Sequence, residues 1–139
     1  MKFKDIMIKD FPIYNLSKTI EENLKNSLDY NFDYIPVLDN YNNFLGFISK
    51  NEILKIHFNS KKNTIDNISK YINKVTTNVK ENQKIDTLEE IPEHPLAVID
   101  KNTFIKGIIP ISKIANYFQN FSQELKKELD IILKSSRNG

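Results

Sequence analysis

The sequence predicts an α/β (α+β) fold, built from two β-α-β-β-α units and a C-terminal amphipathic helix. Two observations lead to this prediction. Gly46 and Gly107 lie 61 residues apart in matching apolar surroundings, and at the same offset Ile35–Asp39 matches Leu96–Asp100. From about Ile111 onward, apolar residues recur in steps of three and four, which is typical of a helix with one apolar face. A repeat at constant spacing indicates two copies of one supersecondary unit.

Each unit contains a predicted β-hairpin. The apolar runs Tyr34 to Leu38 and Leu96 to Ile99 have the length and β-branched content of buried strands. Segments rich in Asp and Asn follow both runs and predict turns. The second strands run from Phe44 to Ile48 and from Phe104 to Ile109. A glycine inside each second strand indicates a bulge, or a place where a ligand or another backbone comes close.

Helices are predicted on both sides of the first hairpin. Ser17 to Glu21 offers an N-cap followed by acidic residues, which predicts a helix start, and Lys50 to His57 is a shorter helix. In the second unit the corresponding helix, Ile85 to Ile91, is cut short by the prolines that follow it. Strand-like pieces begin the two units at Phe11 to Leu16 and Val75 to Val79. These elements divide the chain into a first repeat (1–58), a linker (59–66), a second repeat (67–118) and a C-terminal helix (119–139) leading towards a missing downstream domain.

Composition narrows the classes of protein that remain. The chain has 139 residues, no cysteine and a net charge of +2. Disulfides, thiol catalysis and Cys-ligated metals are therefore excluded. No stretch approaches the roughly 18 apolar residues of a membrane span, and no signal peptide is present, so the cytoplasm is the expected compartment. The near-neutral charge predicts no direct nucleic-acid binding and no membrane partner.

Several segments together resemble a known family. In the first unit they are Asp5-Ile6-Met7, Ile35 to Asp39 and Leu45 to Leu54, and in the second Val98 to Asp100, Gly107 to Ile109 and Ile114. These segments resemble the cystathionine-β-synthase-type (CBS) repeat, which usually occurs as a tandem pair called a Bateman module. The resemblance covers about residues 1–118. It implies two repeats packed about a pseudo-twofold axis, two clefts for adenosine-containing ligands such as AMP, ATP or S-adenosylmethionine, and a homodimer.

The resemblance also implies ligand-binding positions in the first unit: Ile13, Tyr14, Tyr34, Ile35, Pro36, Ser49 and Glu52. Ser49 stands at a predicted helix start, where backbone N–H groups favour a phosphate or a carboxylate. Glu52 replaces the family's aspartate, which binds ribose hydroxyls. The alternative interpretation is that Ser49 only caps the helix and Glu52 is a solvated acid of its first turn.

The equivalent positions of the second unit are Thr77, Val79, Pro95, Leu96, Ala97, Pro110 and Lys113. Pro110 replaces the family's Ser or Thr and offers neither a hydroxyl nor an N–H. Lys113 replaces the acidic residue; it can attract a phosphate but cannot accept a hydrogen bond from ribose. This second cleft is therefore predicted to be degenerate, or to bind something other than a nucleotide.

No catalytic residue, metal ligand or required cofactor is predicted, and the chain is predicted not to be an enzyme. His57 and His94 are the only histidines and make no metal-ligand pattern. The adjacent glutamate pairs lie on different faces of their helices, which makes a poor acid–base dyad. No nucleophile-elbow sequence accompanies Ser49.

The C-terminal helix has two possible roles. Its apolar stripe runs through Ile114, Phe118, Phe121, Leu125 and Ile132, with Leu129 and Leu133 widening it. This stripe either packs back on its own repeat, or pairs with a second copy or transmits a signal. The segment from Leu129 to Gly139 resembles the helix that leads into a PAS sensory domain. That resemblance implies the N-terminal sensor part of a bacterial transcription regulator.

The leading hypothesis is a dimeric regulatory module that senses an adenosine-containing metabolite and controls an attached output domain, in signal transduction or transcription regulation. The alternative is a ligand-free structural module that only dimerises. A nucleic-acid-binding domain is a third class, and the balanced charge argues against it.

Overall fold

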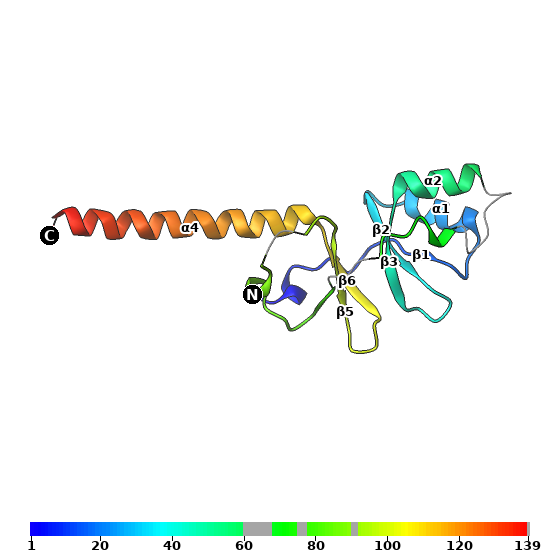
Figure 1. Ribbon diagram of the computed structural model, residues 1–139, viewed down its shortest axis with the longest axis horizontal. Helices are drawn as coiled ribbons and strands as arrows, with labels where there is room; N and C mark the ends of the chain where they lie inside the picture. The colour runs from blue at the N-terminus through cyan, green and yellow to red at the C-terminus, as the bar shows by residue number, and fades with distance from the viewer. Residues whose placement is uncertain (60–67, 75–77, 90–91, 139) are drawn as a thin grey trace.

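A computed structural model describes residues 1–59, 68–74, 78–89 and 92–138. It shows two three-stranded sheets side by side and a long helix, α4 (Ile111–Asn138), that projects from the second of them (Figure 1). The predicted α/β fold with two repeated units and a C-terminal helix is thus confirmed. Among the described residues, none of the helices has both the length and the apolar character that crossing a membrane requires.

The two sheets have the same topology. In the first sheet β1 (Tyr14–Asn15) runs parallel to β2 (Tyr34–Leu38), which pairs antiparallel with β3 (Phe44–Ser49). In the second sheet the corresponding strands are β4 (Asn78–Lys80), β5 (Leu96–Ile99) and β6 (Ile105–Ile109), paired in the same way.

The hairpin registers confirm the sequence repeat. Val37 faces Gly46 in the first hairpin, and Val98 faces Gly107 in the second. In both hairpins the register then shifts by one residue, which is the signature of a β-bulge. The predicted bulge beside each glycine is therefore present, at equivalent positions 61 residues apart.

The helices follow the prediction in the first repeat but not in the second. Helix α1 (Ile20–Leu28) is capped by Thr19, and α2 (Lys50–Phe58) by Ser49. The predicted helix from Ile85 to Ile91 is wrong: the structure has a 3-10 turn, η2 (Ile85–Thr87), and Leu88 is already extended. The backbone N–H of Ile85 donates to the carbonyl of Met1 at 3.0 Å, so the N-terminal segment lies against this turn.

Two hydrophobic cores lie under the two sheets, and a third cluster joins them. The first core contains Tyr14, Ile35, Val37, Ile48, Ile53, Ile56 and Ile68. The second contains Phe3, Val79, Ile85, Leu96, Val98, Ile109 and Ile114. Between the sheets, Phe47, Ala97 and Ile108 are buried against each other. The repeats therefore share an apolar interface in addition to their own cores.

The leading segment of each repeat crosses to the other repeat. Phe3, in the 3-10 turn η1 (Phe3–Asp5), is fully buried in the second core, and Ile8 pairs with Ile108 of β6 through hydrogen bonds of 2.8 and 3.0 Å. Conversely, Ile68 is buried in the first core, and Asn73 pairs with Phe47 of β3 at 2.7 and 3.0 Å. Each sheet edge is thus completed by the opposite unit, as the blue N-terminal segment beside β5 and β6 shows (Figure 1).

Helix α4 (Ile111–Asn138) has an inner and an outer part. Ile114 is buried in the second core, and Tyr117 and Phe118 pack against that core. Further along, Leu125, Leu129 and Ile132 are 50%, 56% and 64% exposed. The beginning of the helix therefore packs on its own repeat, whereas no described residue covers the apolar stripe of its outer part.

Candidate functional site

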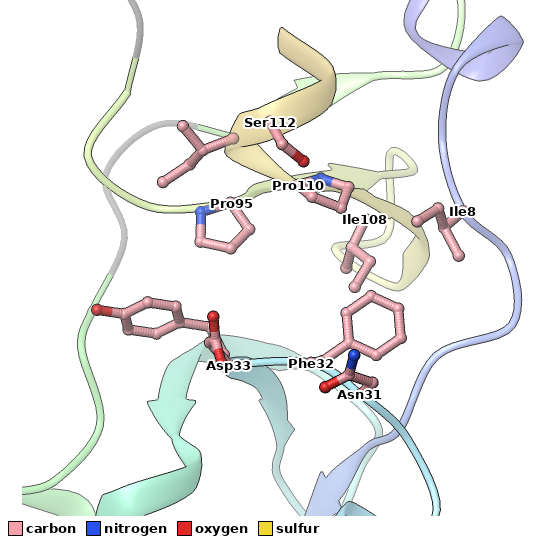
Figure 2. A pocket seen from close by; sticks show the side chains of 10 residues that line it. Ile8, Asn31, Phe32, Asp33, Pro95, Ile108, Pro110 and Ser112 are labelled. Atoms are coloured by element: carbon pink, nitrogen blue, oxygen red, sulfur yellow. The ribbon is translucent and has the colours of Figure 1, made fainter. Parts of the chain in front are cut away.

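A cleft of about 480 Å³ lies between the two repeats. One wall is the segment 31–34, which leads into β2. The other is formed by Pro95, Pro110 and the first two residues of α4, Ile111 and Ser112. Ile8 and Ile108 close one end (Figure 2). A ligand in this cleft would therefore touch both repeats and the beginning of α4.

The walls are largely apolar, with a few polar groups. The apolar lining residues are Ile8, Phe32, Tyr34, Pro95, Ile108, Pro110 and Ile111. The polar ones are Asn31, Asp33 and Ser112; in Figure 2 the first two lie on the wall opposite Ser112. Flat apolar walls suit a planar ring, and a few polar groups can fix its orientation. A cleft of this size and composition can hold a small molecule.

Helix α2 holds the wall made by residues 31–34 in place. The backbone N–H of Lys50 donates to the carbonyl of Asp33 at 3.0 Å, and the Lys50 ammonium donates to the carbonyl of Tyr30 at 2.6 Å. Phe32 packs into the apolar cluster between the sheets. The segment is thus anchored at both ends although it is not part of a helix.

The opposite wall is the N-terminus of α4. The N–H groups of Lys113 and Ile114 both donate to the carbonyl of Pro110, at 3.1 and 3.4 Å. Because proline has no side-chain acceptor, it cannot cap the N–H groups of Ile111 and Ser112, which the first turn of a helix leaves without an intrahelical partner. Both residues line the cleft, so a ligand oxygen can take the place of the missing cap.

The predicted ligand-binding residues of the first repeat do not all lie at one site in the structure. Tyr34 lines the cleft. Ile35, Pro36 and Tyr14 are buried, and burial raises the pKa of the Tyr14 phenol. The carbonyl of Ile13 accepts a hydrogen bond from the Asn26 side chain at 3.0 Å. Only Tyr34 of this group therefore faces the cleft described above.

Ser49 and Glu52 bind each other at the start of α2. The Ser49 hydroxyl accepts from the Glu52 backbone N–H at 3.2 Å and donates to the Glu52 carboxylate at 2.9 Å. Ser49 is thus the N-cap of α2, as the capping interpretation states, but Glu52 is not a freely solvated acid, because its carboxylate accepts from the Ser49 hydroxyl. Both side chains are half-buried, and a ligand that used them would have to replace the bond between them.

The predicted ligand-binding residues of the second repeat are also divided among different sites. Pro95 and Pro110 line the cleft, together with Tyr34 of the first repeat. Leu96 and Ala97 are buried. Val79 is buried and lines a smaller pocket of about 270 Å³. The Lys113 ammonium donates to the carbonyl of Ile6 at 3.3 Å and does not line the cleft, and Thr77 lies outside the described residues.

Several lining residues were not predicted from the sequence: Ile8, Asn31, Phe32, Asp33, Ile108, Ile111 and Ser112. For the segment before Tyr34, a signal existed, because it directly precedes a predicted ligand-binding strand. For Ile8 no local signal existed, because its position depends on pairing with Ile108, which is 100 residues away in sequence.

The two histidines lie in different surroundings. His94 packs edge-on against Tyr34, with ring centroids 5.8 Å apart, and so joins the two repeats beside the cleft. His57 packs against Phe58 at the end of α2, at 6.2 Å. In the part of the chain that the structure describes, no three His, Asp or Glu side chains are grouped so that they could hold a metal ion.

Replacing Ser49 by alanine tests its role as a cap. We expect Ser49→Ala to lower the free energy of unfolding by about 1 kcal/mol, because the N–H of Glu52 loses its acceptor. Thermal unfolding followed by circular dichroism measures the loss. Ser135→Ala, at an exposed position of α4, is the matched control and should leave the melting temperature nearly unchanged. Equal effects of the two substitutions would contradict the capping role.

Comparison with known proteins gives one family. Residues 3–58 match the family model for the CBS domain. No curated protein sequence matches the chain.

Three solved structures show how far the fold extends. The CBS domain of a putative transporter from Clostridium difficile 630 is 21% identical, with a TM-score of 0.69 over 86% of this chain and 94% of that one. The CBS domain pair of protein MJ0100, in complex with 5′-methylthioadenosine and S-adenosyl-L-methionine, is 20% identical, with a TM-score of 0.63 over 86% and 97%. CBSX2 in complex with AMP is 15% identical, with a TM-score of 0.62 over 87% and 98%. Residues 3–58 are therefore similar to the CBS domain family, and the chain has, over most of its length, the fold of a CBS domain pair.

Proposed function

We propose that the chain is a cytoplasmic regulatory module that senses an adenosine-containing metabolite in the cleft between its repeats. The observation that carries this proposal is the origin of the cleft walls, which come from residues 31–34 of the first repeat and residues 95 and 110–112 of the second. A ligand bound there would favour one relative orientation of the repeats, by at most its difference in affinity for the two orientations.

Two neighbours of the fold support the choice of ligand. The CBS domain pair of protein MJ0100 was solved with 5′-methylthioadenosine and S-adenosyl-L-methionine, and CBSX2 with AMP. All three molecules contain adenosine. In this chain the adenine ring would lie among Phe32, Tyr34 and the prolines, while Asn31 and Ser112 offer hydrogen bonds to its edge or to the ribose.

Ser49 and Glu52 remain the proposed second binding position, on the first-repeat side. Their mutual hydrogen bond already satisfies both groups, so we assign them the lower affinity of the two positions.

Helix α4 would carry the signal. Its first residues line the cleft, and its outer part projects away from both repeats (Figure 1). We propose that the exposed stripe of Leu125, Leu129, Ile132 and Leu133 pairs with the same stripe of a second copy to form a homodimer. The helix would then lead to an output domain, in signal transduction or transcription regulation. The PAS-like segment from Leu129 to Gly139 supports this last step.

The exposed stripe also favours the alternative function, a ligand-free module that only dimerises. Five large apolar side chains of α4 between Leu125 and Leu133 are at least 47% exposed, which is unusual for a monomer. This function needs no ligand. It predicts a dimer whose stability does not change when adenosine compounds are added.

A thermal-shift panel distinguishes the two functions. The probes are adenosine, AMP, ATP, 5′-methylthioadenosine and S-adenosylmethionine, with a salt control. A ligand at 100 times its Kd stabilises the folded state by about 2.7 kcal/mol. We therefore expect at least one probe to raise the melting temperature by several degrees.

A variant that fills the cleft is the control for this experiment. Ser112→Tyr places a ring in the cleft at the N-terminus of α4 and should abolish the rise in melting temperature. Ser135→Tyr, on the exposed part of the same helix, should leave that rise unchanged. If no probe shifts the wild-type protein and sedimentation shows a dimer, the ligand-free function is the correct one.

A further inference from the structure

We propose that the cleft accepts an adenosine derivative whose 5′ substituent is neutral or positively charged, and discriminates against a phosphorylated one. This inference rests on the proposed function, that is, on an adenosine compound binding between the repeats. It is drawn from the charges of this chain's own residues around the cleft, on both walls.

Asp33 supplies the only charge among the described residues that line the cleft. None of these described residues is a lysine, an arginine or a histidine. The Asp33 backbone carbonyl accepts from Lys50, but its carboxylate has no hydrogen-bond donor and no ion-pair partner among the described residues. In Figure 2 this side chain stands on the lower wall, facing Pro95 and Pro110. Its negative charge is therefore available to a ligand.

The lysine that holds the first wall, Lys50, and the lysine that follows the second wall, Lys113, are both engaged in hydrogen bonds. The Lys50 ammonium donates to the carbonyl of Tyr30 at 2.6 Å, and the Lys113 ammonium donates to the carbonyl of Ile6 at 3.3 Å. Neither residue lines the cleft. A phosphate would thus enter a site with an uncompensated carboxylate and no cationic side chain in its lining.

The partial positive charge at the N-terminus of α4 does not outweigh the negative charge of Asp33. A helix end is equivalent to roughly half of an elementary charge, and Asp33 carries a full negative charge. Pro110 also supplies no hydroxyl at the N-cap position, which leaves the neutral Ser112 hydroxyl as the side-chain donor of this wall. The helix end can instead bind a neutral oxygen or the carboxylate of an amino-acid group, while Asp33 attracts an ammonium or a sulfonium. Opposite walls of the cleft are therefore suited to opposite ends of a zwitterionic substituent.

The size of the effect follows from Coulomb's law. One charge pair near a solvated surface changes affinity by about five- to tenfold, and AMP brings two negative charges. We expect 5′-methylthioadenosine to bind at least about tenfold more tightly than AMP, because the two share the nucleoside and differ in the charge of the 5′ substituent. S-adenosylmethionine, with a sulfonium and an ammonium, should bind at least as tightly as 5′-methylthioadenosine.

Isothermal titration calorimetry of the full chain with these three compounds, at low ionic strength, tests the inference. The Asp33→Asn variant should bind AMP about five- to tenfold more tightly than the wild type does. It should bind S-adenosylmethionine about five- to tenfold more weakly, and its affinity for 5′-methylthioadenosine should change little. The matched control is Asp86→Asn, which makes the same change of charge at an exposed residue of η2 that does not line the cleft. It should leave all three affinities as they are.

The outcomes separate this inference from the proposed function. If AMP binds the wild type as tightly as 5′-methylthioadenosine, or if Asp33→Asn leaves the ratio of the two affinities unchanged, the charge selection is overturned while the adenosine sensor stands. If none of the three compounds binds the wild type, the proposed function itself fails.

Discussion

Replacing Phe3 by alanine should lower the free energy of unfolding by about 3–5 kcal/mol, which is a large part of the total stability of a small domain. Phe3 is fully buried, and its ring belongs to the core under the second sheet although it is the third residue of the chain. Removing it leaves a cavity among Ile85, Leu96 and Ile109. Urea unfolding followed by circular dichroism measures the change.

The matched control for Phe3 is another phenylalanine. Phe58, at the end of α2, is 82% exposed, so Phe58→Ala should change the stability by no more than about 0.5 kcal/mol. A loss at Phe3 as small as the loss at Phe58 would show that the N-terminal segment is not part of the second core in solution.

Replacing Gly46 by alanine should cost about 2–5 kcal/mol. Gly46 has φ of +151°, a conformation that is costly for any residue with a Cβ, by about 1–3 kcal/mol. An added Cβ would also lie 2.2 Å from the carbonyl oxygen of Asn73, so the backbone pairing of Asn73 with Phe47 would have to shift. Loss of these hydrogen bonds accounts for the remainder, at about 0.5–1.5 kcal/mol each. Differential scanning calorimetry measures the change.

Gly107, the equivalent glycine of the second repeat, provides the comparison. A Cβ there would meet the side chain of Met7, whose Sδ, Cγ and Cβ lie at 2.7, 2.8 and 2.9 Å. A new rotamer can move the Met7 Sδ and Cγ, but the Met7 Cβ is fixed to the backbone, so the N-terminal segment would also have to shift. Gly107 does not have the positive φ of Gly46, so Gly107→Ala should cost about 1–3 kcal/mol, less than Gly46→Ala. An equal or larger loss at Gly107 would contradict the assignment of backbone contact to one glycine and side-chain contact to the other.

Local patterns of the sequence were sufficient to predict the hairpins. The 61-residue offset between Val37 and Val98, and between Gly46 and Gly107, appears unchanged in the strand registers. The cause is that a buried strand with one fixed glycine leaves little freedom of register. The two interpretations of the glycines, a bulge and a close approach, both hold. The close contact is with the crossing segment of the other repeat.

The predictions were weaker where distant parts of the chain decide the structure. Correspondence with the first repeat predicts a helix from Ile85 to Ile91, but the N-terminal segment bonds to this stretch, and a 3-10 turn forms at Ile85–Thr87. The cleft shows the same limit. The resemblance to the CBS repeat predicts Tyr34, Pro95 and Pro110 as lining residues. Asp33 and Ile8 join the lining of the cleft only when the two repeats pack together. Sequence spacing within one repeat contains no information about that packing.

The crossing of residues 1–8 and 68–73 also bears on how such a tandem can arise. A chain split between Asn59 and Ile68 would give two fragments with incomplete cores, one lacking Ile68 and the other lacking Phe3. Each fragment could fill its gap only by associating with the other, so the two should recover their structure together and not separately. By the same logic, a single-repeat ancestor would have been complete only as a segment-swapped dimer. Joining two such units in one chain would turn an exchange between two molecules into an exchange within one.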